Sequence, residues 1–349
     1  GAAAWSLDVA AEAAALVPNG RGPAREGVRV DRPAALEGLL TFPLSAVDQR
    51  GFVCPGLLRV DAASGAVPEL RRIAPGETIW IPGEPAASPD TTFVTVSPDA
   101  GSRLLVGFDG SGAPRVVVRE PFEDNLWIEA ATDRWVFQSG QPAGSGVWGS
   151  GFLQWSAPDG TPRGRVAGAA GPALVASGDA LFFVAQARAA RVDLAGCAVG
   201  WERTLARAPP PSRRALSAIA EAFPILTATG GVLVSHQVYT SPDGTSAAIE
   251  PGPGWVVEVG QDGAEHFRAR LPDGLLRGGG AALHRGRWFV AASRPVWQTR
   301  IQAFDLAGQE PAASGWVTRH GSMARERAGS DVRTAGRRPS PIGLGTNGP

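Results

Sequence analysis

Lysine is absent from this chain of 349 residues, so all 33 of its basic residues are arginines. A chain without lysine amines has no Schiff-base lysine, no phosphate-loop lysine and no lysine general base, which excludes the enzyme classes that need one. Lysine codons are poor in GC, whereas arginine, alanine, glycine and proline codons are rich in it. The bias therefore indicates a bacterium with a GC-rich genome.

Several other features are also scarce. Cysteine occurs twice, as Cys54 and Cys197, and the sequence leaves open whether the two form a disulfide or are separate thiols. The 33 arginines are balanced by 33 acidic residues, so no net charge draws the whole chain to nucleic acid or to an anionic membrane. No run of about 18 apolar residues occurs, and no transmembrane helix is predicted.

The chain begins at Gly1 without a methionine and without the basic and apolar regions of a signal peptide. We expect that a leader has been removed and that the protein is extracytoplasmic, in the periplasm, on the outer surface or secreted. The sequence leaves open whether a lipid anchors it.

The sequence is rich in pairs of short strands joined by a turn of aspartate and glycine. Aspartate hydrogen-bonds the backbone ahead of it and glycine accepts a positive φ angle, so both suit tight turns. With one glycine per turn as a marker, the intervals are 47, 48, 36, 67 and 45 residues, or about 49 on average. The six markers are Gly65, Gly112, Gly160, Gly196, Gly263 and Gly308.

A second pair of apolar strands precedes most of these markers, as in 126–139, 173–186, 225–237 and 281–293. Each period then holds four short strands rich in Val, Leu, Phe and Trp. Four strands in about 40 to 50 residues make one blade of a β-propeller. The sequence predicts an all-β fold, a β-propeller of six or seven four-stranded blades.

Two of the repeats resemble the PQQ-like repeat of the quinoprotein β-propellers. The residues that carry the resemblance are Val192-Asp193-Leu194-Ala195-Gly196 with Trp201, and Ala303-Phe304-Asp305-Leu306-Ala307-Gly308 with Trp316. The resemblance implies that each of these tryptophans packs between neighbouring blades. This superfamily includes quinone-dependent dehydrogenases and also non-catalytic assembly or scaffold proteins.

The quinone-binding residues of that superfamily are not present in this chain. The quinone enzymes hold their cofactor between a tryptophan and a ring formed by two adjacent cysteines, and they bind Ca²⁺ through clustered carboxylates and amides. Here the two cysteines are far apart and asparagine occurs only three times. We therefore expect a non-catalytic member without a cofactor.

The predicted propeller spans 38–318, and 1–37 is an N-terminal segment that closes the ring if a seventh blade forms. An insertion at about 206–224 interrupts the propeller, where a proline run precedes apolar residues at helical spacing, which predicts a loop with one short helix. Those residues are Leu216, Ile219, Ala220 and Phe223. Residues 319–349 lose the strand pattern and hold six arginines against two acidic residues, which predicts an extended basic tail.

The common hydrolase, metal-binding and phosphate-loop motifs do not occur in the sequence. Gly144–Gly149 fits G-x-G-x-x-G, but a strand follows it instead of a helix, so we interpret it as a loop between strands. The four histidines occupy different positions in their repeats and are expected to be structural: His236, His266, His284 and His320. No catalytic or metal-binding residue is predicted.

The candidate partner-binding residues are tryptophans and arginines outside the regular strand pattern. Trp148 and Trp297 lie in loops marked by Gly, Ser or Pro, and Arg294 and Arg300 flank Trp297. Aromatic and arginine side chains are enriched at protein interfaces. The tail adds arginines that suit an acidic protein face or another anionic surface: Arg325, Arg327, Arg337 and Arg338. The alternatives are tryptophans folded over their own blades and a solvated tail.

Two functions are consistent with these features. The first is a non-enzymatic protein–protein interaction or structural module of an envelope or extracellular assembly, whose partners are proteins and not nucleic acid. The alternative is a propeller enzyme that acts on a glycan or another polymer with side chains gathered from several blades. Three or more titratable side chains from different blades around one pocket would favour the enzyme. Because no catalytic motif is present, we expect the first.

Overall fold

The computed structural model describes residues 5–17, 28–30, 34–36, 38–47, 53–72, 86–88, 90–99, 102–109, 113–120, 124–142, 151–169, 173–185, 188–205, 216–241, 250–271, 275–293, 299–306 and 308–313. These residues are almost all in β-strands, which form six antiparallel sheets. The helices among them are α1 (Val9–Ala13) and the 3₁₀ helix η1 (Ala14–Leu16). The predicted all-β fold is confirmed.

Sheet 1 has five short strands in four positions. Two of them, β1 (Val28–Val30) and β2 (Ala34–Leu36), pair with opposite ends of β3 (Leu39–Val47), so they form two parts of one edge strand. Beyond β3 lie β4 (Val53–Asp61) and β5 (Glu69–Arg72).

Sheets 2 to 5 each contain four strands that pair in chain order, as the repeat predicts. Sheet 2 contains β6 (Ala86–Ala87), β7 (Thr91–Asp99), β8 (Ser102–Asp109) and β9 (Pro114–Glu120). Sheet 3 contains β10 (Asp124–Ala131), β11 (Val136–Pro142), β12 (Phe152–Ser156) and β13 (Pro162–Ala167). Sheet 4 contains β14 (Ala173–Ser177), β15 (Ala180–Ala185), β16 (Arg188–Asp193) and β17 (Ala198–Thr204). Sheet 5 contains β18 (Leu216–Leu226), β19 (Val232–Ser241), β20 (Glu250–Val259) and β21 (Glu265–Leu271).

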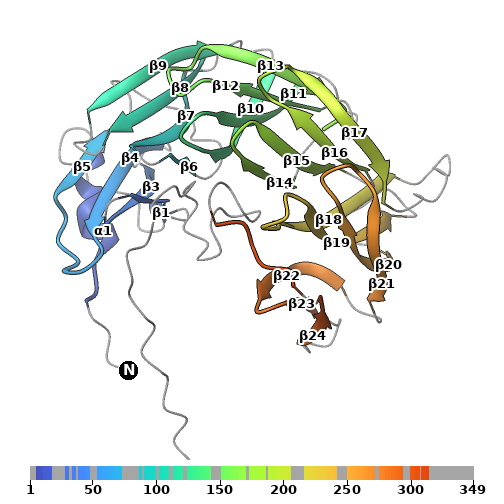
Figure 1. The fold of residues 1–349 in the computed structure, drawn as a ribbon. Coiled ribbons are helices and arrows are strands. Elements are labelled where there is room, and N and C mark those ends of the chain that lie inside the picture. The colour runs from blue at the N-terminus through green and yellow to red at the C-terminus, as the bar shows by residue number, and fades with distance from the viewer. Residues whose placement is uncertain are drawn as a thin grey trace, which may run out of the picture.

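In the described part of the chain, sheet 6 has three strands, β22 (Leu275–His284), β23 (Arg287–Ser293) and β24 (Thr299–Asp305). The sheets follow one another along an arc, from sheet 1 at the left of Figure 1 over the top to sheet 6 at the lower right. The number of blades and the closure of the ring stay predictions.

An apolar cluster joins each pair of neighbouring sheets. Phe182 and Val184 of sheet 4 are buried with Val234 of sheet 5, whereas Leu233, the residue just before Val234, is buried with Trp288 of sheet 6. Successive side chains of a strand point to opposite faces of its sheet, so one strand contributes to two junctions. This alternation explains the density of apolar residues in the second strand of each sheet.

The N-terminal segment packs on the face of sheet 1 that points away from sheet 2. The Asp8 carboxylate caps α1 by accepting hydrogen bonds from the backbone N–H groups of Ala10 and Ala11, at 3.0 and 3.2 Å. Leu16 and Val17 are buried against this face with a cluster that includes residues of β3 and β4. In the described residues, the predicted N-terminal segment of 1–37 therefore adds to the first sheet.

The predicted short helix in the insertion is wrong, because residues 216–226 form strand β18. Its side chains alternate between two junctions: Phe223 and Ile225 are buried toward sheet 6, and Ala222 and Leu226 toward sheet 4. Burial on both faces outweighs the helical preference of an alanine-rich segment. The helical spacing of Leu216, Ile219, Ala220 and Phe223 was therefore not the decisive pattern.

The tight turn after the third strand has the same backbone conformation in most sheets. One residue in each turn adopts a positive φ angle, and it is Gly65, Gly160, Gly263 or Gly308 in four of them. In sheet 4 this residue is Cys197, with φ 51°, and not the marker Gly196. Cys197 is a free thiol on the surface, and its Sγ lies 3.1 Å from the carbonyl oxygen of Arg163.

We expect Cys197→Gly to raise the free energy of unfolding by about 0.5–1 kcal/mol, because glycine relieves the left-handed strain at a smaller entropic cost. Gly308→Ala is the converse control, since Gly308 has φ +79° and a Cβ there would meet no atom within 4 Å. It should lose about 1 kcal/mol by conformation alone. Urea unfolding measures both changes. A Cys197→Gly variant that is less stable than the wild type would contradict the assignment of left-handed strain to Cys197.

Candidate functional site

The predicted partner-binding residues lie outside the described part of the chain: Trp148, Trp297, Arg294, Arg325, Arg327, Arg337 and Arg338. Arg300 belongs to β24, but its side chain is not described. The same holds for the G-x-G-x-x-G segment of 144–149 and for His320 and Trp316, which are not described at all. Described strands flank Trp148, Arg294 and Trp297, whereas no described strand follows the tail arginines.

Strands that pair in chain order alternate in direction, so successive connections lie at opposite ends of each sheet. The turns after the first and third strands lie at one end, here called the turn end, and the connections from second to third strand lie at the other, the loop end. Residues 143–151 connect β11 to β12 in sheet 3, and residues 294–298 connect β23 to β24 in sheet 6. Trp148 and Trp297 therefore belong to two loop-end connections.

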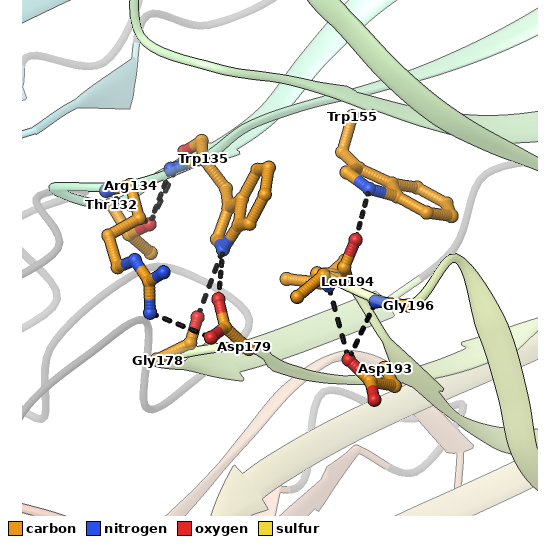
Figure 2. Close-up of polar contacts among 10 residues, drawn as sticks. Thr132, Arg134, Trp135, Trp155, Gly178, Asp179, Asp193, Leu194 and Gly196 are labelled. Atoms are coloured by element: carbon orange, nitrogen blue, oxygen red, sulfur yellow. Dashed lines mark hydrogen bonds and ion pairs between the residues drawn. The ribbon is translucent and has the colours of Figure 1, made fainter.

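At the turn end, tryptophan side chains of one sheet contact the turn of the next. Trp155 of β12 donates its indole N–H to the carbonyl of Leu194 in sheet 4, at 3.3 Å (Figure 2). Trp201 of β17 makes the same contact with Gln261 of sheet 5, at 3.0 Å. The packing that the resemblance implied for Trp201 is confirmed, and Trp155 extends it to the preceding junction.

A second contact of this kind joins the first turns of sheets 3 and 4. The indole N–H of Trp135 lies 3.1 Å from the Gly178 carbonyl and 3.2 Å from Oδ1 of Asp179, whose Oδ2 pairs with Arg134 at 2.8 Å (Figure 2). Trp135 is nearly buried, whereas the ion pair is half exposed. The indole therefore contributes apolar burial and one directed bond, and the screened ion pair adds little.

An arginine takes the place of tryptophan at the junction between sheets 1 and 2. Arg59 lies two residues before its turn begins, as Trp155 does, and its guanidinium donates to the carbonyl of Asp109 in sheet 2, at 3.2 Å. The side chain is buried and also pairs with Glu69 at 3.5 Å. Each of these donors thus satisfies a turn carbonyl in the next sheet with a side-chain N–H.

Glycine makes room for the indole rings. A Cβ on Gly164 would lie 2.2 Å from Cζ2 of Trp155, and one on Gly263 would lie 2.8 Å from Cγ of Trp201. In sheet 3 the ring comes from the third strand and glycine stands beside it on the fourth, whereas in sheet 4 the ring comes from the fourth strand. Equivalent spaces at two successive sheet junctions are therefore filled by tryptophans from different strands.

In the described residues, charges from two sheets meet around Glu265 at the junction of sheets 4 and 5. Arg268 donates two hydrogen bonds to this carboxylate, at 2.7 and 2.8 Å, and Arg203 of sheet 4 lies 3.6 Å away. The hydrogen bonds from Arg268 lower the pKa of Glu265, although partial burial acts in the opposite direction. A carboxylate held in its charged form by two arginines is poorly suited to donate a proton in catalysis.

Aspartates of the turns accept hydrogen bonds from groups of their own turns, and for Asp61 and Asp159 these bonds lower the pKa. Backbone and side-chain hydrogen bonds from Ser64 lower the pKa of Asp61, and those from Thr161 lower the pKa of Asp159. Asp193 accepts from the backbone N–H groups of Ala195 and Gly196, both at 3.1 Å (Figure 2). These carboxylates shape their own turns.

The three described histidines do not converge. His236 is buried within sheet 5, His284 is exposed in the β22–β23 turn, and His266 lies 3.9 Å from Glu258. Across the described segments, no three side chains of His, Cys, Asp or Glu are grouped so as to hold a metal ion. His236 lies on β19 and His266 on β21 of the same sheet, so the expectation that the histidines fall in separate repeats is wrong for this pair.

Sequence reasoning missed Arg59, the role of Gly164, and Trp5, whose indole N–H donates to the Ala62 carbonyl in the β4–β5 turn at 3.1 Å. Arg59 and Trp155 share a position two residues before a turn, and an alignment of the repeats on their turns would have shown it. This shared position is hard to recognise because one residue is arginine and the other tryptophan. The two side chains are similar only in that each is long and carries an N–H donor.

No protein-family model matches the chain. No curated protein matches it either. Among the helices described, none is long and apolar enough to cross a membrane.

Several solved structures show a distant likeness. BamB from Moraxella catarrhalis is 12% identical, with 81% of this chain and 95% of that chain covered and a TM-score of 0.35. Prolyl oligopeptidase B from Galerina marginata is 10% identical, with 89% and 45% covered and a TM-score of 0.49. An apocarotenoid oxygenase from Synechocystis is 10% identical, with 71% and 63% covered and a TM-score of 0.42. At these values we draw no functional conclusion from the likeness.

We expect Gly164→Ala to lower the free energy of unfolding by about 1–3 kcal/mol, because the added methyl group overlaps the buried Trp155 ring. Gly164→Ala should cost less free energy of unfolding in a protein that already carries Trp155→Leu than it costs in the wild type. The reason is that the alanine methyl group and the indole ring compete for one space. Gly200→Ala is the matched control, as its Cβ would meet the flexible end of Arg191 at 3.1 Å and the Arg191 carbonyl oxygen at an ordinary contact distance of 3.6 Å. Equal costs for the two alanine variants in urea unfolding would contradict this packing.

We expect Glu265→Gln to weaken the acid dependence of stability. The folded-state pKa of Glu265 is lowered, so its stabilising contribution is complete above its unfolded pKa of about 4.3 and is lost as pH falls through the folded value. The variant should be less stable than wild type at neutral pH, by under about 1 kcal/mol after solvent screening. The two unfolding free energies should converge on acidification; parallel curves would exclude this role.

Proposed function

We propose that this chain is a non-enzymatic protein–protein interaction module of an extracytoplasmic assembly, and that its partners bind at the loop end. The observation that carries the proposal is topological. The connections that contain Trp148 and Trp297 both join a second strand to a third strand, so both belong to the end opposite the tight turns.

The flanking strands support a defined position for each connection. In sheet 6, Ser293 pairs with Thr299, which leaves five residues between the paired positions, among them Arg294 and Trp297. In sheet 3, Gly140 pairs with Phe152 on either side of the longer connection that holds Trp148. Tryptophan and arginine carried by a rigid sheet are the residues that most often dominate binding energy at interfaces.

The state of the described charged groups supports binding over catalysis. The carboxylates with resolved shifts, Asp61, Asp90, Asp159 and Glu265, all have a pKa below the ordinary value, because turn backbone, hydroxyl or arginine donors hold them charged. General acid catalysis at neutral pH needs the opposite shift. These groups stabilise turns and junctions.

The tail and the location belong to the same proposal. The arginines Arg325, Arg327, Arg337 and Arg338 would face an acidic protein surface or another anionic surface, because guanidinium groups bind carboxylates and phosphates in pairs of hydrogen bonds. The resemblance to the PQQ-like repeat, whose non-catalytic members are assembly or scaffold proteins, supports an interaction role, and the extracytoplasmic location stays a prediction.

The test is affinity capture from envelope extracts of the source cell, with the full chain as bait. An Arg294→Glu/Trp297→Ala variant should retain its partners at least about ten-fold less well, because interface anchors of these types typically contribute more than 1 kcal/mol each. Arg285→Glu is the matched control, an exposed arginine of the same sheet at the turn end.

Equal retention by the loop variant and the control would refute the loop-end site. A chain that degrades a glycan or other polymer, with activity lost in the loop variant, would refute the non-enzymatic proposal. Removal of 319–349 separates the contribution of the tail from that of the loops.

A further inference from the structure

We propose that the face of sheet 1 that points away from sheet 2 is a docking surface for a tryptophan-bearing segment of a partner protein. Residues 5–17 of this chain occupy this surface as an internal ligand, and the partner segment competes with them. This inference goes beyond the proposed function and does not depend on it, because the surface belongs to sheet 1 and not to the loop end. The buried residues of the surface are Leu44, Ala46, Leu58 and Val60.

The first observation is that residues 5–17 take the place of a preceding sheet. Leu58 and Val60 lie three residues and one residue before the turn aspartate of sheet 1, and they are 1% and 0% exposed under the N-terminal segment. Ala190 and Val192 occupy the same places in sheet 4. They are 2% and 1% exposed, because sheet 3 covers them. The segment therefore covers a face of the kind that receives a neighbouring sheet.

The second observation is that Trp5 reproduces the contact by which one sheet holds the turn of the next. Its indole donates to the Ala62 carbonyl at 3.1 Å, and a Cβ on Gly65 would lie 2.6 Å from Cγ of the ring. Trp201 of sheet 4 donates to the turn of sheet 5 at 3.0 Å, and a Cβ on Gly263 would lie 2.8 Å from its Cγ. Both glycines have a positive φ angle, of 72° and 82°. Sheet 1 thus contains a ready-made place for an indole that comes from outside the sheet.

The third observation is that side chains alone attach the segment in the part of the chain that the structure describes. There, residues 5–17 join no strand of sheet 1, whose own strands pair with one another. The attachment consists of the Trp5 indole and of apolar side chains, among which Ala13, Leu16 and Val17 are buried. A unit held by so few contacts opens at a small part of the free energy of global unfolding. The sheet keeps its strand pairing when the segment leaves.

The internal ligand defines the chemistry of the partner. A segment that replaces it must offer an indole N–H to the Ala62 carbonyl and apolar side chains to the face beneath. Docking of a short apolar segment into a hydrophobic surface is a common mode of recognition. A second copy offers only the contacts that the tethered segment already makes, and it offers them at a lower effective concentration. The occupant that displaces the segment is therefore part of another protein.

The experiment titrates a fluorescently labelled peptide of residues 5–17 with the full chain and follows its anisotropy. The wild type should bind this peptide weakly, because only chains with an undocked segment are competent. A Trp5→Ala chain should bind the same peptide at least about five-fold more tightly, since its own segment competes less well. On that chain, a peptide that carries Trp5→Ala should lose a similar factor. Equal affinities of the two chains, or of the two peptides, overturn the proposal.

Two glycine substitutions in the Trp5→Ala chain locate the bound indole. Gly65→Ala should weaken peptide binding at least about five-fold, because the methyl group overlaps the place of the ring. Gly38→Ala is the matched control in the same sheet, since Gly38 has φ +79° and a Cβ there would meet no atom within 4 Å. Both substitutions impose a similar backbone strain. Equal affinities of these two chains would contradict the proposed place of the indole.

Hydrogen exchange tests the competition in a chain without substitutions. Excess unlabelled peptide should speed exchange of the Ala10 and Ala11 amides of an isotope-labelled chain, because a displaced short helix loses the cap that Asp8 provides. Unchanged exchange at saturating peptide overturns the proposal.

Sedimentation equilibrium of the chain alone tests the other occupant. We expect a monomer. A dimer that excess peptide dissociates would assign the surface to a second copy and overturn the assignment to a partner protein. These measurements are independent of the loop-end capture experiment, so either can fail alone.

Discussion

The contact on which the arrangement of sheets depends is the hydrogen bond from a side-chain N–H to a turn carbonyl of the next sheet. Apolar clusters between sheets provide most of the burial, but they are not directional, and two apolar faces can slide against each other. The bonds from Trp155, Trp201 and Arg59 fix the position of each turn relative to the neighbouring sheet. The Leu194 carbonyl is buried and would cost free energy without a partner, so Trp155 and the turn of sheet 4 specify one another.

The fold was largely predictable because its signals are local. Period-two apolar strands and Asp-Gly turns recur through the chain, and the strand pairs expected at 126–139, 173–186, 225–237 and 281–293 are all present. The expectation failed at β18, where an alanine-rich sequence resembles a helix until the two neighbouring sheets are considered. The marker glycine of sheet 4, Gly196, is also not the residue with the positive φ angle in its turn, which is the adjacent Cys197.

The site was less predictable for a physical reason. The N–H donors that join neighbouring sheets come from the third strand, the fourth strand or the N-terminal segment. They occupy equivalent places in the structure but different positions in the sequence repeat. Trp155 with Gly164 and Trp201 with Gly263 fill equivalent spaces from different strands. The partner-binding residues were selected by composition in loops, and composition does not determine where a loop side chain points.

The return of the chain from sheet 6 to sheet 5 also bears on how the molecule unfolds. In a linear array the terminal repeat has one neighbour and frays first, because it loses the fewest contacts on opening. Here the last sheet is attached to sheet 5 twice, through its apolar face and through the bridge between Thr227 and Pro311. Opening sheet 6 therefore requires the β18–β19 turn of sheet 5 to be disturbed as well. Because of this bridge, we expect the last two sheets of the described part of the chain to unfold as one cooperative unit.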